Sequence, residues 1–478
     1  MRTQLNKIRL FFNFIIQQTM MKSYLKLATL SLTLLLGACQ SNSGWQELFN
    51  GKDLTGFKQL NGQAPYSVED GCLIGRTICG QPNSFMATEK TYGDFILEFE
   101  VKCDPSLNSG VQFRSESKPE YNKGRVHGYQ CEIDPSDRAW SGGIYDEARR
   151  GWLANLVENE AGRAAYKKHD WNKYRIEAIG HSMRIWLNGV NTANLVDDLT
   201  AEGFIAFQVH GIGTNKDREG KEIRWRNIRI KTQDLEAERM QGTLAREINC
   251  IPNTLTASEK ADGWKLLFDG KTASGWRSAG KESFPENGWI IKDGVLTVLK
   301  NGGPSGKRGG DIVTNEQYNA FEFSFDFKLT EGANSGVKYL ILENPKGGVI
   351  GAEYQILDDQ KHPDAKGYTS VPGSRTVASL YDIIPASPKK RVNRVGDWNQ
   401  GIIKVFPNKH VEHWLNGFKV LEYDWASEAF LELVKGSKFV GEGYNTLGQY
   451  GTAEKGHLLL QDHCDEVSYR NLKIRELK

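Results

Sequence analysis

Two stretches of the chain alternate between apolar and polar residues with a period of two. Residues 95–102 read Phe-Ile-Leu-Glu-Phe-Glu-Val-Lys, and residues 321–329 read Phe-Glu-Phe-Ser-Phe-Asp-Phe-Lys-Leu. Successive side chains of a β-strand point to opposite faces, so this pattern is typical of a strand with one apolar face. Both stretches are therefore predicted to be strands of half-buried sheets.

Turn signals separate such strands at short intervals. Residues 186–190 read Trp-Leu-Asn-Gly-Val, and residues 414–418 read Trp-Leu-Asn-Gly-Phe. Asn-Gly between apolar residues favours the two-residue turn of a β-hairpin. A domain built from many short strands closes most readily as a two-sheet sandwich or jelly roll. The predicted fold class is therefore all-β.

The same landmarks occur twice along the chain in the same order. They are residues 44–52 and 263–271, 92–95 and 318–321, 108–111 and 334–337, 145–146 and 381–382, 170–172 and 397–399, 186–189 and 414–417, 208–210 and 461–463, and 226–228 and 470–472. The period is roughly 220 residues, far above that of a solenoid, so each copy is predicted to be a complete domain. The predicted domains are residues 44–231 and 263–478. They are joined by a linker, residues 232–262, with one short helix in the charged run 234–240, and a further short helix is predicted in residues 155–168.

The N-terminal residues have the pattern of a targeting segment. Lys22 and Lys26 precede an apolar run over residues 27–36, which ends in Leu36-Gly37-Ala38-Cys39. The run is too short for a membrane span, and its form is that of a bacterial lipoprotein signal. Residues 1–38 are predicted to be cleaved off, leaving a lipid on Cys39 as the membrane anchor of an exported protein. An ordinary signal peptide or a start-site artefact is the alternative.

Charge and composition exclude several partners. The 478 residues contain 61 Lys and Arg against 59 Asp and Glu, so a nucleic-acid partner or a polybasic membrane patch is not expected. The 50 Gly, 14 Pro and 10% aromatic residues suit a turn-rich β protein better than a disordered one. The oligomeric state is left open.

Two strand-like segments combine an amide and a carboxylate. Gln130 and Glu132 lie two residues apart in residues 128–134, and Glu353 and Gln355 do so in residues 351–358. Each pair therefore shares one face of its strand. Such groups could bind a polyhydroxylated ligand in a cleft, while a solvated strand face is the alternative for each copy alone.

Other polar residues recur in both copies. Gln208 and His210, like Gln461 and His463, put an amide and an imidazole on one strand face, where the imidazole could act as base, acid or metal ligand, or bond to backbone. Tyr145-Asp146 and Tyr381-Asp382 could bind hydroxyl groups or fasten loops, and fastening is favoured for the two Asp. Arg114 and Lys338 follow Asn-Ser-Gly-Val and could face an oxyanion or solvent.

No spaced metal motif is present in the sequence. Asp358 and Asp359, beside His362, could bind Ca²⁺ through their oxygens, but an Asx turn explains them better. No cofactor is predicted, although a divalent cation could serve the site.

Together these motifs resemble the 3-keto-disaccharide hydrolase domain family over both copies. The resemblance rests on Gly-Trp-x-x-Leu-Phe-(Asn/Asp)-Gly-Lys, Asn-Ser-Gly-Val, the Glu-x-Gln-Ile strand, Tyr-Asp, Asp-Trp-Asn, Trp-Leu-Asn-Gly and the terminal Arg-Asn-(Ile/Leu). It implies two tandem concanavalin A-like jelly rolls in an exported bacterial protein. It also implies activity on glycosides whose sugar is oxidised at C3. The second copy follows the pattern more closely, because Gln130 and Glu132 exchange amide and acid in the first.

Such a substrate suits an elimination. A C3 ketone acidifies the C2 proton, so a base can remove it while the enolate oxygen is held by donors or a cation. The bond at C1 then breaks, and water adds back. Glu353 and His463 are the predicted catalytic residues, and a divalent cation could replace Lys338 as the stabiliser. The predicted substrate-binding residues are Lys338, Gln355, Tyr381, Asp382, Gln461, Gln130, Glu132, Tyr145, Gln208, His210 and Arg114. The alternative function is a lectin-like lipoprotein that binds carbohydrate without cleaving it.

Overall fold

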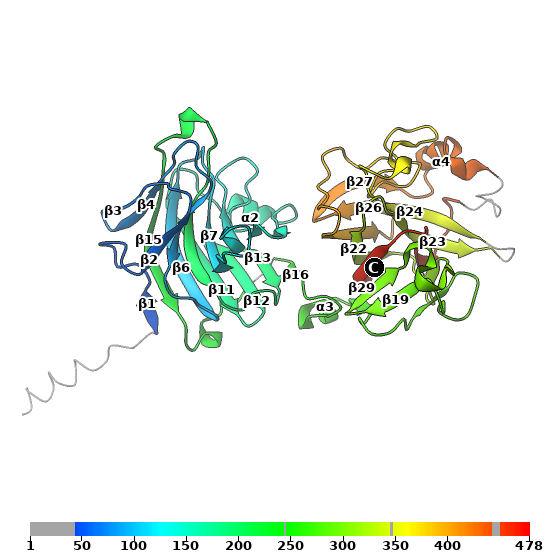
Figure 1. The fold of residues 1–478 in the computed structure, drawn as a ribbon, viewed down its shortest axis with the longest axis horizontal. Coiled ribbons are helices and arrows are strands. Elements are labelled where there is room, and N and C mark those ends of the chain that lie inside the picture. Colours follow the sequence, from blue (N-terminus) through cyan, green and yellow to red (C-terminus); the bar gives the residue numbers. More distant parts are fainter. Residues whose placement is uncertain (1–43, 243–244, 345–347, 442–449) are drawn as a thin grey trace, which may run out of the picture.

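A computed structural model describes residues 44–242, 245–344, 348–441 and 450–478 (Figure 1). The predicted signal segment and Cys39 lie outside these residues. Within them, no helix has the length and apolar character needed to cross a membrane.

The first domain is a sandwich of two sheets. The nine-stranded sheet has the order β3 (Tyr66–Glu69), β4 (Cys72–Arg76), β15 (Glu222–Lys231), β6 (Phe95–Cys103), β11 (Asn172–Ile179), β12 (Ser182–Leu187), β13 (Val190–Val196) and β16 (Glu247–Asn249), with β1 (Trp45–Glu47) beside β15. The seven-stranded sheet has the order β2 (Phe57–Asn61), β5 (Ser84–Thr88), β14 (Phe204–Val209), β7 (Ser109–Glu116), β8 (His127–Ile133), β9 (Ile144–Glu147) and β10 (Gly151–Ala154).

The second domain repeats this arrangement. Its eight-stranded sheet has the order β19 (Trp289–Lys292), β20 (Val295–Val298), β29 (Val467–Glu476), β22 (Phe321–Leu329), β25 (Trp398–Val405), β26 (His410–Leu415) and β27 (Phe418–Asp424), with β17 (Lys265–Leu266) beside β29. Its five-stranded sheet has the order β18 (Trp276–Ser278), β21 (Ile312–Thr314), β28 (His457–Leu460), β23 (Asn334–Glu343) and β24 (Val349–Leu357). Apart from β9, β10 and β16, which have no counterpart among the described residues of the second domain, the two domains share one strand order, and the all-β prediction of tandem sandwiches is confirmed.

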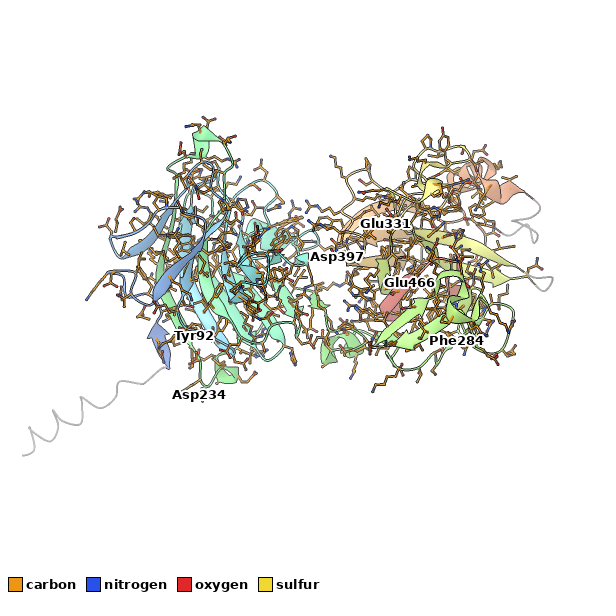
Figure 2. All side chains as sticks on the ribbon, in the orientation of Figure 1. Tyr92, Asp234, Phe284, Glu331, Asp397 and Glu466 are labelled. Atoms are coloured by element: carbon orange, nitrogen blue, oxygen red, sulfur yellow. The ribbon has the colours of Figure 1, made fainter. Side chains whose placement is uncertain are left out.

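The cores follow the alternation seen in the sequence. In β22 the four phenylalanines are fully buried and pack between the sheets, as do the matching residues of β6. Figure 2 shows the side chains crowded around the strands of both domains. Ile96 lies on the other face of β6 but is also buried, because Leu235 and Trp45 cover it. The linker therefore completes part of the first domain's surface.

The linker differs from the single helix predicted for it. Its charged run forms only a 3₁₀ turn, η2 (Glu236–Glu238), and residues 247–249 form β16, which pairs in parallel with β13. The short α-helix of the linker is α3 (Ala257–Ala261), which a capping box of Thr256 and Glu259 starts. The linker is therefore partly helical as predicted, but its α-helix lies outside the charged run 234–240.

The remaining helices are short. They are α2 (Glu160–Ala164), which lies within the helix predicted for residues 155–168, η1 (Lys216–Arg218), η3 (Lys300–Ser305), η4 (Pro363–Lys366), α4 (Glu428–Lys435) and η5 (Lys438–Val440). In the second domain η4 belongs to the connection between β24 and β25, where the first domain has the β9–β10 hairpin, and α4 and η5 belong to the connection between β27 and β28.

Several contacts join the two sandwiches. Trp140 packs on Phe418 with ring centroids 5.6 Å apart. Glu322, which is buried, accepts a hydrogen bond from Arg246 of the linker at 2.7 Å and is also paired with Arg475 of its own domain. These contacts act together with the linker to set the two domains side by side (Figure 1).

Candidate active site

The site is built on the paired strands β23 and β24. Their antiparallel register places Lys338 opposite Glu353 and Gly336 opposite Gln355. The alternate residues of the same strands, such as Val337 and Tyr354, are part of the hydrophobic core. Because side chains alternate between faces, Lys338, Glu353 and Gln355 must emerge together on the face away from the core.

The structure explains why the Asn-Ser-Gly-Val motif contains a serine and a glycine. The Ser335 hydroxyl donates a hydrogen bond to the backbone oxygen of Gln461 at 2.7 Å, which fixes the end of β28 against β23. A Cβ atom on Gly336 would lie only 2.5 Å from Oε1 of Glu353. The glycine is therefore needed so that the Glu353 side chain can lie across β23.

A pocket of about 190 Å³ opens above this face. Six of the predicted residues line it: Lys338, Glu353, Gln355, Tyr381, Gln461 and His463. The segment around η5 and Tyr450 contributes another wall. Residues distant in sequence thus meet at one concave site, as expected for a ligand pocket.

A buried ion pair lies at the base of the pocket. Nζ of Lys338 is 3.6 Å from a carboxylate oxygen of Glu353 and 4.0 Å from one of Asp311. Burial opposes the charged form of Lys338, but the two carboxylates outweigh it, so the pKa of Lys338 is raised above its ordinary value. The amine therefore stays a cation, and it keeps Glu353 paired.

Two amide oxygens at the site have no hydrogen-bond partner among the described residues. They are Oε1 of Gln355 and Oε1 of Gln461, and both atoms are buried. The Gln355 amide nitrogen is 3.4 Å from Oδ1 of Asn334. A buried polar atom without a partner costs about 1–3 kcal/mol, so these oxygens are suited to accept hydrogen bonds from the hydroxyl groups of a ligand.

Tyr381 and Asp382 have different surroundings. Tyr381 lines the pocket and donates its hydroxyl hydrogen to Asp364 at 2.8 Å. Asp382 is fully buried and accepts hydrogen bonds from Arg375, the Thr369 hydroxyl and the backbone N–H of Lys438. The structure thus corrects the placement of Asp382 among the substrate-binding residues, because its carboxylate faces loop residues rather than the pocket.

The surroundings of Asp382 also stabilise its charge. Burial would raise the pKa of this carboxyl, but hydrogen bonds from Thr369, the Lys438 backbone and Arg375 more than compensate, so the pKa is lowered. Asp382 therefore stays ionised and connects the loop after η4 to η5.

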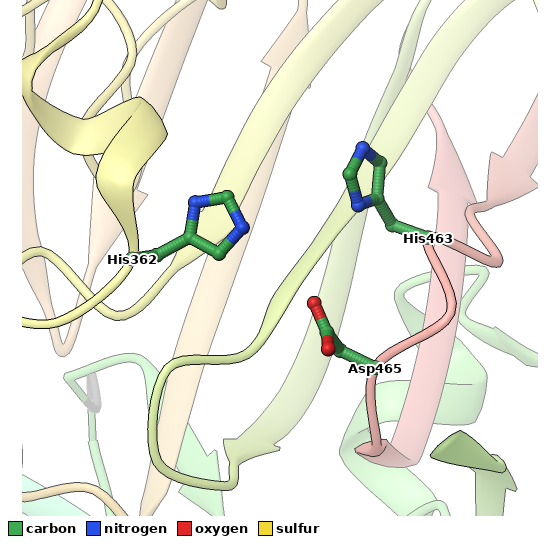
Figure 3. Close-up of side chains that lie close together, drawn as sticks. All are labelled: His362, His463 and Asp465. Atoms are coloured by element: carbon green, nitrogen blue, oxygen red, sulfur yellow. The ribbon is translucent and has the colours of Figure 1, made fainter. Parts of the chain in front are cut away.

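His463 lies at the rim of the pocket beside a second imidazole. The ligand atoms of His362, His463 and Asp465 all lie within 4.8 Å of one another. Figure 3 shows the three side chains close together. Two imidazoles and a carboxylate suit a transition metal or zinc. The His362 Nδ1 accepts a hydrogen bond from the Asp364 N–H at 3.2 Å, so the neutral ring carries its proton on Nε2. A cation bound through Nε2 of His362 would move the ring proton to Nδ1, and Nδ1 could then no longer accept the hydrogen bond from the Asp364 N–H.

The acidic pair near His362 forms turns. Oδ1 of Asp358 accepts the backbone N–H of Gln360 at 3.0 Å, which is an Asx turn, and Asp359 pairs with Lys390 at 2.8 Å. The Asx turn expected for Asp358 is therefore present.

The first domain places amides where the second has its ion pair. Gln130 occupies the position of Glu353, and Gln112 occupies that of Lys338, because Gln112 lies opposite Gln130 in the register of β7 and β8. Nε2 of Gln112 donates to Oε1 of Gln130 at 2.6 Å, and Gln208 donates to the same oxygen at 2.9 Å.

The carboxyl of Glu132 occupies the position of Gln355. Its oxygens accept hydrogen bonds from Asn108 and Gln130, and burial raises its pKa to about 7. Glu132, Gln130, Tyr145 and His210 line a pocket of about 540 Å³, while Gln208 is fully buried behind Gln130. Nδ1 of His210 donates to the backbone oxygen of Gly211 at 2.8 Å.

Comparison with known proteins agrees with the duplication. The sequence profile of the family described as 3-keto-alpha-glucoside-1,2-lyase-like domain matches residues 44–231 and 263–475. The chain belongs to this family. A 3-keto-disaccharide hydrolase of Bacteroides thetaiotaomicron is 35% identical over 237 residues, which are 45% of this chain and 79% of that protein. Family membership places the chain among carbohydrate-active proteins.

Solved structures of similar proteins are also known. One, from Parabacteroides distasonis, is assigned to the glycosyl hydrolases without an established activity; it is 31% identical, covers 48% of this chain and 100% of its own, and has a TM-score of 0.41. A carbohydrate-binding module from Bacillus subtilis, CBM66, is 17% identical, covers 37% of this chain and 96% of its own, and has a TM-score of 0.27.

The structure also corrects the prediction that Arg114 binds substrate. Its guanidinium is buried and donates to the backbone oxygens of Gly93 and Gly180, both at 2.8 Å, and to Asp94. The residue has a positive φ of 44°, and Leu340, its counterpart in the second domain, has one of 52°. This irregularity in both strands turns Arg114 away from the pocket, so Gln112 is the true counterpart of Lys338.

Sequence reasoning missed several residues of the second pocket, namely Asn334, Lys438, Phe439 and Tyr450. Asn334 begins the repeated Asn-Ser-Gly-Val motif, and that repetition could have identified it. The other three come from the connection between β27 and β28, which is much longer than the matching connection between β13 and β14, so no repeat signal marked them.

Proposed function

We propose that the second domain cleaves the glycosidic bond of 3-keto-glycosides by elimination, followed by addition of water. The observation that carries the proposal is the buried Lys338–Glu353 pair at the base of a pocket that also presents two unpartnered amide oxygens. The name of the Bacteroides thetaiotaomicron relative, 3-keto-disaccharide hydrolase, supports the substrate class.

The reaction begins with transfer of the C2 proton to Glu353. Charge then moves from the carboxylate to the ketone oxygen at C3, and Lys338 lies beside the carboxylate that loses this charge. The positive charge of Lys338 stabilises the negative charge that develops on the enolate oxygen, which lowers the barrier to proton transfer. The amides of Gln355 and Gln461 accept hydrogen bonds from the remaining hydroxyl groups and orient the sugar ring.

The enolate then expels the group at C1. The C1–O bond breaks, a double bond forms between C1 and C2, and the leaving oxygen takes a proton from His463 at the rim of the pocket. Water then adds its hydroxyl to C1 and gives its other proton back to His463, while the proton held by Glu353 returns to C2. As an alternative to this proton donor, a divalent cation held by His362, His463 and Asp465 would supply positive charge near the sugar oxygens when bound.

The decisive experiment follows the release of the leaving group from a 3-keto-glucoside. Glu353→Gln and His463→Ala should each lower kcat about 100-fold or more, the usual contribution of a general base or acid. Glu454→Gln and His410→Ala are matched controls, because both residues lie outside the pocket. Near-normal rates in both active-site variants would remove this assignment.

Isotope labelling separates elimination from direct displacement. In D₂O the proton returned to C2 comes from solvent when Glu353 exchanges its proton before water adds. The product should then carry deuterium at C2, above the level in a sample without protein. A product free of deuterium, together with no rate effect of deuterium placed at C2 of the substrate, would exclude elimination. Binding of the glycoside without any product would favour a lectin-like function instead.

We also propose that the protein is exported and anchored through a lipid on Cys39. The support is the sequence Leu36-Gly37-Ala38-Cys39 after the apolar run. Full-length protein should partition into the detergent phase of a Triton X-114 extract, and Cys39→Ala should move it to the aqueous phase. Equal partitioning of the two proteins would contradict the anchor.

A further inference from the structure

The first domain has a pocket of its own, and the pocket is larger than that of the second domain. Its volume is about 540 Å³, compared with about 190 Å³. The larger value lies within the usual range for small-molecule sites, roughly 300–1,000 Å³. The walls also differ, since the β9–β10 hairpin contributes Tyr145, Glu147 and Trp152 to this pocket, whereas Lys438, Phe439 and Tyr450 from the connection with η5 line the other.

The base of this pocket is a network of buried amides. Gln112 donates to Gln130, Gln208 donates to the same oxygen, and Gln130 donates to Glu132. Oε1 of Gln208 is buried and has no partner among the described residues. Gly110 leaves room for Gln130, as Gly336 does for Glu353, since a Cβ on Gly110 would lie 2.4 Å from Cδ of Gln130. The polar surface is thus held in place by its own hydrogen bonds.

One wall of the pocket is aromatic. Tyr145 and Trp152 both line it, with ring centroids 5.2 Å apart, and both are partly exposed. The guanidinium of Arg138 lies 5.1 Å from the Trp152 ring centroid and is hydrogen-bonded to Asp134 at 2.7 Å. An aromatic wall next to hydrogen-bonding amides matches both the apolar C–H face and the hydroxyl groups of a sugar ring.

The charges around the pocket balance one another. Three arginines and three acidic residues line it, namely Arg125, Arg138, Arg218, Glu132, Asp134 and Glu147. Arg125 pairs with Glu147 at 3.2 Å, and Arg138 pairs with Asp134. Since most of these charges are already compensated, the pocket favours a neutral ligand over an anionic one.

The base of the pocket lacks the ion pair proposed for elimination. Neither Gln112 nor Gln130 exchanges a proton near neutral pH. Glu132, with its pKa near 7, could act as a base. However, both of its oxygens already accept hydrogen bonds, from Asn108 at 2.5 Å and from Gln130 at 2.9 Å. The carboxyl of Glu132 therefore holds the amides of Asn108 and Gln130 in place.

We propose that the pocket of the first domain binds a neutral carbohydrate without cleaving it, so that the chain joins a binding domain to a catalytic one. The binding part stands on the geometry of the first pocket alone. The division of labour rests on the function proposed for the second domain.

The test uses the full chain carrying Lys338→Gln and Glu353→Gln, which gives both pockets the same amide pair. Binding of trehalose, maltose, cellobiose and lactose is measured by calorimetry, with and without Trp152→Ala. We expect at least one of these neutral disaccharides to bind, and Trp152→Ala to weaken that binding about tenfold or more, as loss of a central aromatic contact does. Trp171→Ala removes a tryptophan outside the pocket and should leave binding unchanged.

Two results would overturn the proposal. One is the absence of binding by all four sugars, or binding that Trp152→Ala does not alter. The other is substantial turnover of the corresponding 3-keto-disaccharides by the double variant, since this would assign cleavage to the first domain. If the unmodified chain showed no turnover, the function proposed for the second domain would fail, while the Trp152-dependent binding would still be measured separately.

Discussion

Exchanging the Lys338–Glu353 pair for two glutamines tests how the charges of the site are balanced. The first domain shows that this fold accepts the exchange, because Gln112 and Gln130 form a 2.6 Å hydrogen bond at the same positions. Three variants are compared: Lys338→Gln, Glu353→Gln and the double variant. Each single variant leaves one charge of a buried pair behind, whereas the double variant leaves none.

The expected free energies follow from the distances. At 3.6 Å and an effective dielectric constant of about 20, the attraction between Lys338 and Glu353 is about 4.6 kcal/mol. Lys338→Gln leaves Glu353 buried without its cation and should destabilise the second domain by about 3–5 kcal/mol. Glu353→Gln should cost less, because Lys338 keeps Asp311 at 4.0 Å. The double variant should lie within about 1–2 kcal/mol of the unmodified chain, so the coupling free energy should exceed about 2 kcal/mol.

Hydrogen exchange followed by mass spectrometry measures these changes within each domain. Amides of β23 and β24 report opening of the second domain, and amides of β7 and β8 provide an internal reference. All three variants should lose activity. The charge-balance argument is refuted if the double variant is destabilised by the sum of the two single variants, or if Glu353→Gln costs more than Lys338→Gln.

Three further predictions concern other parts of the two sites. The pKa of Glu132 is raised from 4.5 to about 7, so the folded state binds more protons than the unfolded state between these pH values, and stability falls as pH rises. Glu132→Gln removes this dependence, so its unfolding free energy relative to that of the unmodified chain should increase by about 2.5 kcal/mol from pH 5 to pH 8. A difference that does not change with pH would contradict the burial argument. Gly336→Ala should displace the Glu353 carboxylate and lower kcat roughly 100-fold while the circular dichroism spectrum stays unchanged, whereas an unchanged kcat would show that the space is not needed. Asp382→Asn should lower the stability of the second domain by about 2–4 kcal/mol, and it should raise KM because the neighbouring Tyr381 lines the pocket. A raised KM with unchanged thermal unfolding would instead indicate that Asp382 itself contacts the substrate.

Local patterns in the sequence were enough to predict the strands and the duplication. Alternation over residues 95–102 and 321–329 marks β6 and β22, and it does so because the side-chain period is a property of a single strand. The same reasoning placed Glu353 and Gln355 on one face. Comparison of the two copies then added Gln461 and His463 to Glu353 and Gln355 as candidate site residues, and all four line one pocket.

Other features depended on contacts between distant segments. The sequence alone predicted a cationic role at the site for Arg114, but an irregular residue with positive φ turns this side chain toward backbone oxygens. Asp382 belongs to a network with Arg375 and the Lys438 backbone, and no spacing in the chain indicates that the latter segment approaches it.

The sequence by itself thus determined that the protein is a pair of β-sandwiches, and which strand faces carry its polar groups, because both follow from short-range periodicity and repetition. Only the tertiary structure decided which of those groups meet. Gln112 rather than Arg114 faces Gln130. The connection with η5 lines the smaller pocket, and the β9–β10 hairpin lines the larger one. These outcomes depend on strand register and loop packing, which arise when segments far apart in the chain come together.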